Sequence, residues 1–142
     1  MRGYLMTIRI TDDGSERDIN EIHAMLKDYN LSHREPSKNV PLGIYYENEK
    51  GEKQAGLVGE TFGNWLCIKY LFVSEELRGQ GIGKKIIESA EEEAKKRGRK
   101  YAFVDTFSFQ APGFYQKLGF REVFALENYP YTEARFYYTK EL

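Results

Sequence analysis

Cysteine is nearly absent from this chain of 142 residues: Cys67 is the single one, so no disulfide can form within the chain. A chain without disulfides is typical of a reducing compartment. The sequence also lacks the run of about 18 apolar residues that a membrane span requires, and its first residues lack the apolar core of a signal peptide. We therefore expect a cytoplasmic protein with no membrane partner.

An excess of charge of either sign is also absent. With 21 basic and 22 acidic residues the net charge is −1, which gives no indication of a nucleic-acid partner. His23 has no cysteine or acidic residue at ligand spacing, so no metal site is expected. The length fits one domain spanning residues 1–142.

Apolar periodicity predicts a mixed α/β order. Strands are expected at residues 5–10, 42–46, 55–62, 65–73, 101–107, 120–126 and 135–139, and helices at 15–29, 82–97 and 110–118. Tight turns join the strands between 42 and 73, which predicts an antiparallel meander. A helix separates the strand at 65–73 from the next one, so those two strands should pair in parallel. The strand at 65–73 is almost continuously apolar, so we expect both of its faces to be covered.

Ion pairs are predicted along one face of the helix at 82–97. Glu91, Glu92 and Glu93 each precede a lysine or arginine by four residues, in the orientation that favours pairing. Such a series is typical of a helix face exposed to solvent.

The stretch of greatest interest is residues 78–84, Arg-Gly-Gln-Gly-Ile-Gly-Lys, which we call the glycine turn. It connects a predicted strand to a predicted helix, and the first amides of a helix have no acceptor within the helix. Those amides and the helix dipole favour an anion such as phosphate. Lys84 and Lys85 stand where cations oppose the dipole, and a bound anion would offset that cost.

Two common phosphate motifs do not fit the glycine turn. A Walker A loop needs a glycine where Arg78 stands and a hydroxyl where Lys85 stands. The dinucleotide fingerprint G-x-G-x-x-G requires a third glycine at Lys84 or at Ile86, depending on the starting residue. Neither a P-loop nor a dinucleotide site is therefore predicted.

The pattern Arg-x-x-Gly-x-Gly over residues 78–83 resembles the acyl-CoA pyrophosphate motif of the GNAT N-acetyltransferase superfamily. A second stretch, Ala-Pro-Gly-Phe-Tyr-Gln-Lys-Leu-Gly-Phe at residues 111–120, is similar to the signature Ala-x-x-Phe/Leu-Tyr-x-x-x-Gly-Phe of the same family. It lies one strand downstream of the glycine turn, as in that family. Two motifs in register are more specific than one.

The resemblance implies an α/β (α+β) fold with a GNAT-like, mixed and mostly antiparallel seven-stranded sheet flanked by helices. Its parallel pair would splay apart after residues 73 and 107, and acyl-CoA would bind in the crevice. Main-chain groups near residues 71–73 could pair with an extended pantetheine arm. The cofactor-binding residues expected from this are Leu71, Phe72, Val73, Arg78, Gly79, Gln80, Gly81, Ile82, Gly83, Lys84, Ser108, Ala111, Phe114 and Tyr115.

By the same resemblance, Tyr115 is the expected proton donor to the departing thiolate. A general base is harder to assign, because Lys69 stands in the region where many relatives carry an acidic residue. Glu60 is the first candidate, Asp105 the second and a water relay the third. Ser108 replaces the asparagine that contacts the cofactor in many relatives, and it retains one hydrogen-bond donor.

The sequence therefore predicts an acetyl-CoA-dependent N-acetyltransferase, with acetyl-CoA as co-substrate and direct attack by a primary amine in a ternary complex. The acceptor is a small-molecule or peptide amine that the sequence does not identify, and the resemblance is compatible with a homodimer through the last strands. A non-catalytic acyl-CoA sensor of the same fold is the alternative, favoured by Lys69 and Ser108. A nucleotide-binding module is a second alternative.

Overall fold

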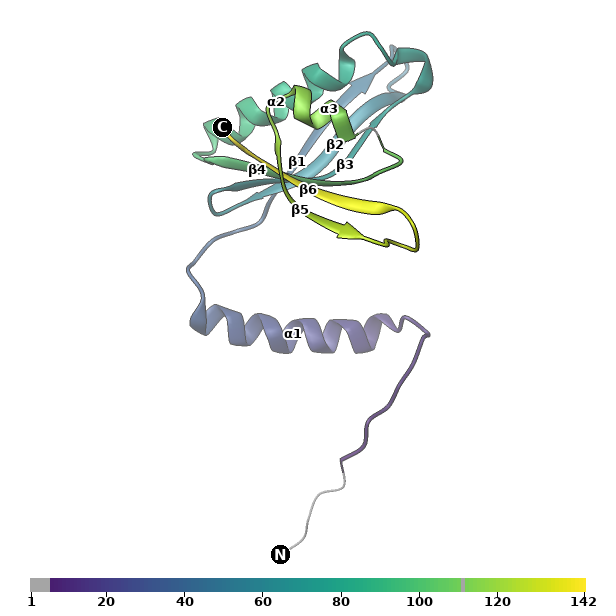
Figure 1. Cartoon of the computed structure of the whole chain (residues 1–142). Helices are drawn as coiled ribbons and strands as arrows, with labels where there is room; N and C mark the ends of the chain where they lie inside the picture. The colour runs from purple at the N-terminus through teal and green to yellow at the C-terminus, as the bar shows by residue number, and fades with distance from the viewer. Residues whose placement is uncertain (1–5, 111) are drawn as a thin grey trace, which may run out of the picture. The chain divides into compact units, whose positions relative to one another are not determined.

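The structure is a computed structural model that describes residues 6–110 and 112–142. The chain forms two compact units, Met1–Pro36 and Ser37–Leu142. Figure 1 shows helix α1 (Glu16–His33) in the first unit. The helix begins after Ser15, whose hydroxyl accepts a hydrogen bond from the Asp18 amide at 3.3 Å. This cap satisfies one of the free amides of the first turn. The helix continues beyond its predicted end at residue 29.

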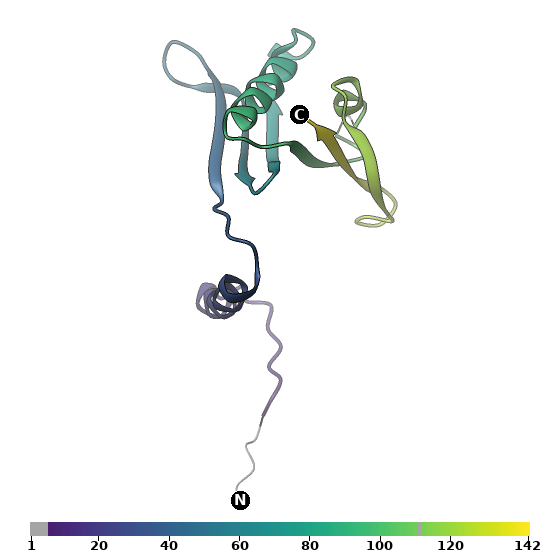
Figure 2. The ribbon, with the colours of Figure 1, turned by 90° about the vertical axis from the view of Figure 1, so that its left-hand side faces the viewer.

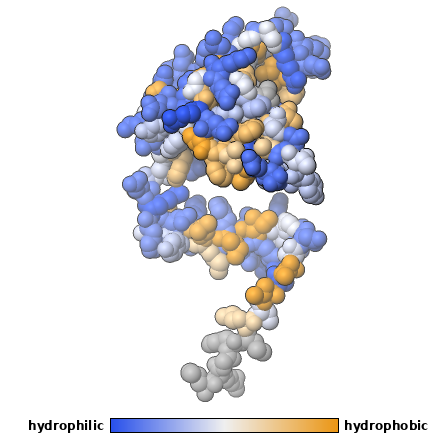
Figure 3. Space-filling model, viewed as in Figure 1, coloured by the Kyte–Doolittle hydropathy of each residue, from blue (hydrophilic) through white to orange (hydrophobic). Residues whose placement is uncertain are grey.

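The apolar residues of α1 follow the expected helical spacing, yet none of its residues is buried. Figure 3 shows apolar side chains exposed along this helix. No helix in the described part of the chain is both long and apolar enough to cross a bilayer. The exposed apolar residues of α1, at 55–69% relative exposure, are Ile19, Ile22, Met25, Leu26, Tyr29 and Leu31.

The predicted strand at residues 5–10 is not found. Residue 5 lies outside the described residues, and none of residues 6–10 is in a strand. Met6, Ile8 and Ile10 are each more than 85% exposed. The alternation of apolar and polar residues is present, but a strand also needs a neighbour to accept and donate its backbone hydrogen bonds.

The second unit is built on a mixed sheet of six strands, not the seven predicted, among the residues that the structure describes. The spatial order is β1-β2-β3-β4-β6-β5. Only β3 and β4 pair in parallel, as expected from the helix between them, and the other pairs are antiparallel. The strands are β1 (Val40–Glu47), β2 (Lys53–Phe62), β3 (Trp65–Val73), β4 (Tyr101–Phe107), β5 (Arg121–Glu127) and β6 (Ala134–Glu141).

Within this unit the helices cover one face of the sheet. Helix α2 (Ile82–Lys96) lies across β1 to β3, and the short α3 (Pro112–Lys117) lies near β5, whose hairpin with β6 diverges from the first three strands (Figure 2). The expectation that both faces of β3 are covered is wrong, because Tyr70 and Phe72 are 71% and 63% exposed. The core under α2 consists mainly of Leu57, Leu66, Ile68, Ile86, Ile87, Ala90, Ala94, Ala102 and Val104.

One predicted solvent-facing residue of α2 belongs to the interior. Glu91 is 7% exposed, and the Lys140 ammonium of β6 contacts its two carboxylate oxygens at 2.7 and 2.9 Å. Of the three predicted i,i+4 pairs, the structure records an ion pair for Glu93 with Arg97, at 3.4 Å. A buried carboxylate needs a partner, and the Glu91–Lys140 ion pair supplies one and connects α2 to strand β6.

Candidate active site

The site begins where the two parallel strands part. Backbone pairing between β3 and β4 covers only Trp65 to Ile68 and Tyr101 to Val104, although β3 continues to Val73 and β4 to Phe107. Beyond Ile68 and Val104 the two strands leave a notch in the sheet with main-chain groups facing it. The parallel strands do splay apart as expected, but the predicted position after residues 73 and 107 is wrong, because the register already ends at Ile68 and Val104.

A β-bulge in β3 lies at the root of this notch. Val58 pairs with Tyr70 and Gly59 pairs with Ile68, so Lys69 is an extra residue without a register partner on β2. Bulges bend a strand and redirect its side chains. The backbones approach closely here, because a Cβ atom added to Gly59 would overlap the carbonyl oxygen of Cys67.

The glycine turn lies at the other end of the notch, directly after β3 and the 3₁₀ helix η1 (Glu75–Leu77). Gly79 and Gly81 have φ values of 80° and 77°, which residues with a Cβ rarely adopt. A Cβ at either glycine would meet no atom within 4 Å, so both face open space. Gly81 is the N-cap of α2, and the Lys85 amide donates to its carbonyl at 3.1 Å. Amides that precede Lys85 in this turn have no acceptor within the helix.

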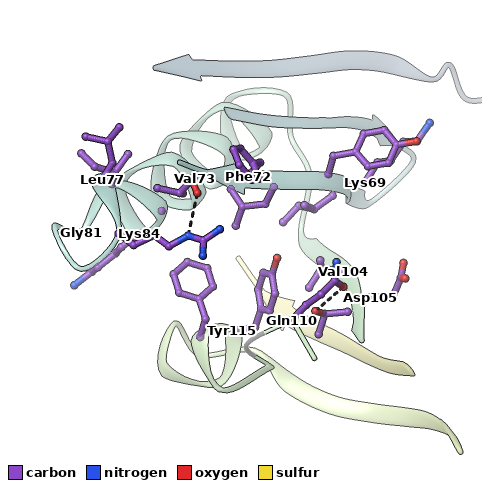
Figure 4. Close-up of a pocket in the computed structure, with 18 of the residues that line it drawn as sticks. Lys69, Phe72, Val73, Leu77, Gly81, Lys84, Val104, Asp105, Gln110 and Tyr115 are labelled. Atoms are coloured by element: carbon purple, nitrogen blue, oxygen red, sulfur yellow. Dashed lines mark hydrogen bonds between the residues drawn. The ribbon is translucent and has the colours of Figure 1, made fainter. Parts of the chain in front are cut away.

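Two cationic side chains flank the turn. The Arg78 guanidinium folds back over the end of β3 and donates from Nε to the Val73 carbonyl at 3.1 Å. Lys84 lies 3.9 Å from Glu88 and is 63% exposed. Both side chains line the same cavity as the glycines, and Figure 4 labels Lys84 and Gly81 at this end of it. The helix N-terminus and two cations therefore give this end of the cavity a positive potential.

The cavity is an open cleft of about 990 Å³ that runs from the glycine turn to the notch. Most of the predicted cofactor-binding residues come together there. Those that line it are Leu71, Phe72, Val73, Arg78, Gly79, Gly81, Ile82, Gly83, Lys84, Phe114 and Tyr115. Gln80 does not line it, since its side chain donates to the Glu76 carbonyl at 3.1 Å. Ala111 lies outside the described residues.

Tyr115 projects from α3 toward β3, with its hydroxyl in the cavity (Figure 4). The side chain is 8% exposed and packs edge-on against Phe114 and Phe120 and parallel to Tyr138. Burial, with a smaller contribution from the negative charge of Asp105, raises the pKa of Tyr115 to about 12. The phenol therefore keeps its proton throughout the neutral range, as a proton donor must.

The raised pKa makes a prediction for stability at high pH. An unfolded tyrosine ionises near pH 10 and the folded Tyr115 near 12, so its contribution to stability is complete below about pH 10 and is lost between about 10 and 12. We expect Tyr115→Phe to reduce that loss by roughly 3 kcal/mol, which is two pKa units. Urea unfolding at pH 8 to 12 measures the free energy of unfolding of both proteins. An equal dependence of that free energy on pH in the wild type and in Tyr115→Phe would contradict the prediction.

Several cavity residues were not predicted as site residues: Ile68, Tyr70, Leu77, Val104, Thr106, Phe109 and Gln110. The Gln110 side-chain carbonyl accepts hydrogen bonds from the Phe107 amide at 2.9 Å and from the Thr106 hydroxyl at 3.3 Å. These bonds close the turn after β4. They use only the side-chain carbonyl of Gln110, so its side-chain nitrogen can donate to a ligand. The sequence signal was weak, because a glutamine after a strand has many ordinary roles.

Ser108 and Glu60 do not line the cavity. The Ser108 hydroxyl donates to Glu133 and accepts from the Ala134 amide at 3.2 Å, so it joins β4 to the β5–β6 hairpin. Glu60 accepts from Asn39 at 2.9 Å and lies 3.4 Å from the Lys69 ammonium. Asp105, the second candidate base, does line the cavity.

The chain belongs to the GNAT acetyltransferase family. The family model described as "Acetyltransferase (GNAT) domain" matches residues 41–122, which include the notch, the glycine turn and Tyr115. An acetyltransferase of Agrobacterium fabrum is 41% identical over 98 residues, covering 69% of this chain and 72% of that protein. A blasticidin-S acetyltransferase of Streptomyces morookaense is 39% identical over 94 residues, covering 63% of this chain and 69% of that protein.

Solved structures share the fold. A crystal structure of an acetyltransferase from Agrobacterium tumefaciens has a TM-score of 0.91 and 33% identity, covering 96% of this chain and all of that chain. A streptothricin acetyltransferase from Bacillus anthracis, solved in complex with acetyl coenzyme A, has a TM-score of 0.64 and 20% identity over 80% of this chain and 68% of that chain. At that identity the likeness concerns the fold alone.

Proposed function

We propose that this acetyltransferase transfers an acetyl group from acetyl-CoA to the nitrogen of a primary amine, by direct attack in a ternary complex. The observation that carries the proposal is that the glycine turn and the Tyr115 hydroxyl line one cleft, on either side of the notch between β3 and β4. Acetyl-CoA, when bound, supplies the activated thioester carbonyl.

The residues at the glycine turn fit a diphosphate. Gly79 and Gly81 leave open space where a Cβ would obstruct a ligand, and the amides that precede Lys85 have no acceptor within the helix and could bind an anion. Arg78 and Lys84 add two cations that would pair with phosphate oxygens. A protein of the same fold crystallised with acetyl coenzyme A supports the choice of this co-substrate.

The backbone at the notch would position and polarise the thioester. Residues 71–73 have no partner on β4, and the Val73 carbonyl accepts from Arg78, so the remaining main-chain groups that face the notch can pair with an extended arm as an added strand would. The bulge at Lys69 frees further backbone groups beside the point where the strands part. Amide donors fixed by the sheet need no reorganisation when negative charge develops on the carbonyl oxygen, which is the basis of oxyanion stabilisation.

Tyr115 would protonate the departing sulfur. Its raised pKa keeps the phenol protonated at neutral pH, and we propose that it releases the proton together with departure of the thiolate. Cys67 is not proposed as an acyl carrier, since burial raises the pKa of its thiol and disfavours the reactive thiolate.

Asp105 is better placed than Glu60 to accept the proton of the amine. Asp105 lines the cleft, whereas Glu60 is held by Asn39 and Lys69 outside the lining. We expect Asp105→Asn to lower kcat/KM about tenfold or more and to flatten the acidic limb of its pH profile. Glu60→Gln should keep that limb. If the acidic limb of the kcat/KM profile were lost in Glu60→Gln and kept in Asp105→Asn, Glu60 would be the base instead.

Binding and turnover test the proposal separately. Isothermal titration calorimetry with acetyl-CoA should show one site, and a panel of primary amines should release free CoA, with an N-acetylated product seen by mass spectrometry. Binding without turnover of any amine would favour the acyl-CoA sensor. Binding of ATP but not of CoA would favour a nucleotide-binding module. The single cysteine supports a cytoplasmic setting for the reaction.

A further inference from the structure

Two ion pairs border the root of the notch, one on each side. The last paired residues of the parallel strands are Ile68 and Val104, so Lys69 and Asp105 are the first residues after the strands part. Both line the cleft. Their partners, Glu60 and Arg135, stand on the neighbouring strands β2 and β6 and do not line it.

The Lys69 ammonium has capacity for another anion. It lies 3.4 Å from one Glu60 oxygen, and the other Glu60 oxygen is occupied by Asn39 at 2.9 Å. The Lys69 side chain is 50% exposed, whereas that of Glu60 is 23% exposed. A lysine has three donors in its ammonium group. Glu60 therefore pairs with the Lys69 ammonium from outside the cleft lining, and the half-exposed ammonium can still bind an anion in the cleft.

Asp105 is held in a similar way from its own side of the notch. Arg135 Nε and Nη2 both contact the Oδ2 oxygen of Asp105, at 2.7 and 2.6 Å, which leaves Oδ1 as an acceptor. The guanidinium itself is fixed among the rings of Phe107, Tyr129 and Tyr137, at 5.4–5.5 Å from each centroid. The carboxylate is thus oriented by a rigid partner that stays outside the cleft.

We propose that the acceptor is an amine that also carries a carboxylate or similar anion, as an amino acid does. The anion would pair with Lys69 and the amino group would donate to Asp105 Oδ1. This rests on the N-acetyltransferase function proposed above. A purely cationic amine would be repelled by Lys69, and a purely anionic ligand by Asp105. Lys69 would then select the substrate.

Matched pairs of acceptors test the proposal: L-amino acids and their primary amides, each with saturating acetyl-CoA. The amide has the less basic amino group, so more of it is neutral and chemical reactivity alone favours the amide. We expect kcat/KM for the preferred acid to exceed that for its amide at least tenfold. Lys69→Gln should remove this preference by raising KM for the acid tenfold or more, and Lys69→Arg should restore part of it.

Controls separate recognition from folding and from the proposed function itself. Lys96→Gln, at an exposed position on α2, should behave as the wild type. The affinity of Lys69→Gln for acetyl-CoA should be unchanged. Three results would overturn the inference while leaving N-acetylation intact. The amides could be used as well as the acids, Lys69→Gln could affect both equally, or only amines that lack an anion could be acetylated. Failure of the wild type to bind acetyl-CoA would remove the proposed function and the inference with it.

Discussion

Replacing Tyr115 with phenylalanine is expected to lower kcat about a hundredfold or more while leaving the affinity for acetyl-CoA within about twofold. The phenol would donate a proton only as the thiolate departs, so its loss should appear in the chemical step. The ring itself packs against Phe114, Phe120 and Tyr138, and phenylalanine retains those contacts. Steady-state kinetics and calorimetry with acetyl-CoA measure the two quantities.

Tyr138→Phe is the matched control for this experiment. Tyr138 is 1% exposed and stacks on Tyr115 at 6.1 Å, but it does not line the cleft. Removing its hydroxyl should leave kcat within about threefold of the wild type. Normal turnover in Tyr115→Phe would exclude the phenol as the proton donor, and an equal loss in both variants would indicate a packing effect.

Gly59→Ala is expected to destabilise the sheet by about 3 kcal/mol. The new methyl group would overlap the carbonyl oxygen of Cys67 and lie 3.3 Å from the Ile68 Cα. These neighbours are backbone atoms of a central strand, so relief requires β2 and β3 to separate at the bulge. Lys69 would move with them, and we also expect a lower affinity for the acceptor. Urea unfolding measures the loss of stability.

Gly113→Ala provides the comparison, because the same methyl group there meets nothing within 4 Å. Gly113 lies in α3, where alanine is favoured over glycine by up to about 1 kcal/mol. The urea concentration at the unfolding midpoint should therefore be unchanged or higher in Gly113→Ala than in the wild type. A Gly59→Ala protein as stable as the wild type would show that the strands can separate at the bulge without cost.

Local patterns predicted the end of the cleft at the glycine turn. The glycine turn needs only a strand, three glycines and a helix start, and all of these are contiguous in residues 71–84. The parallel pairing of β3 with β4 followed from the intervening helix, because such crossovers allow little else. Tyr115 was found through a second contiguous stretch. Each of these predictions rested on a contiguous stretch of residues or on the order of consecutive elements.

The other end of the cleft, at Lys69 and Asp105, could not be predicted in this way. In the sequence, Lys69 favoured the alternative of a non-catalytic acyl-CoA sensor. Its position relative to Glu60 and Asp105 depends on a bulge and on the register across three strands. Glu91 looked like a solvent-facing residue of α2 until Lys140, 49 positions away, supplied its partner. Ser108 was expected in the cofactor site but bonds to the β5–β6 hairpin.

The sequence by itself determined the family, the order of the elements from β1 onward and the glycine turn at one end of the cleft, because each depends on contiguous residues and short-range backbone geometry. The tertiary structure alone decided the strand count, the bulge at Lys69 and the two ion pairs at the notch. Those features require backbone pairing and charge contacts between residues distant in sequence, such as Asp105 with Arg135, and no contiguous stretch of residues specifies them.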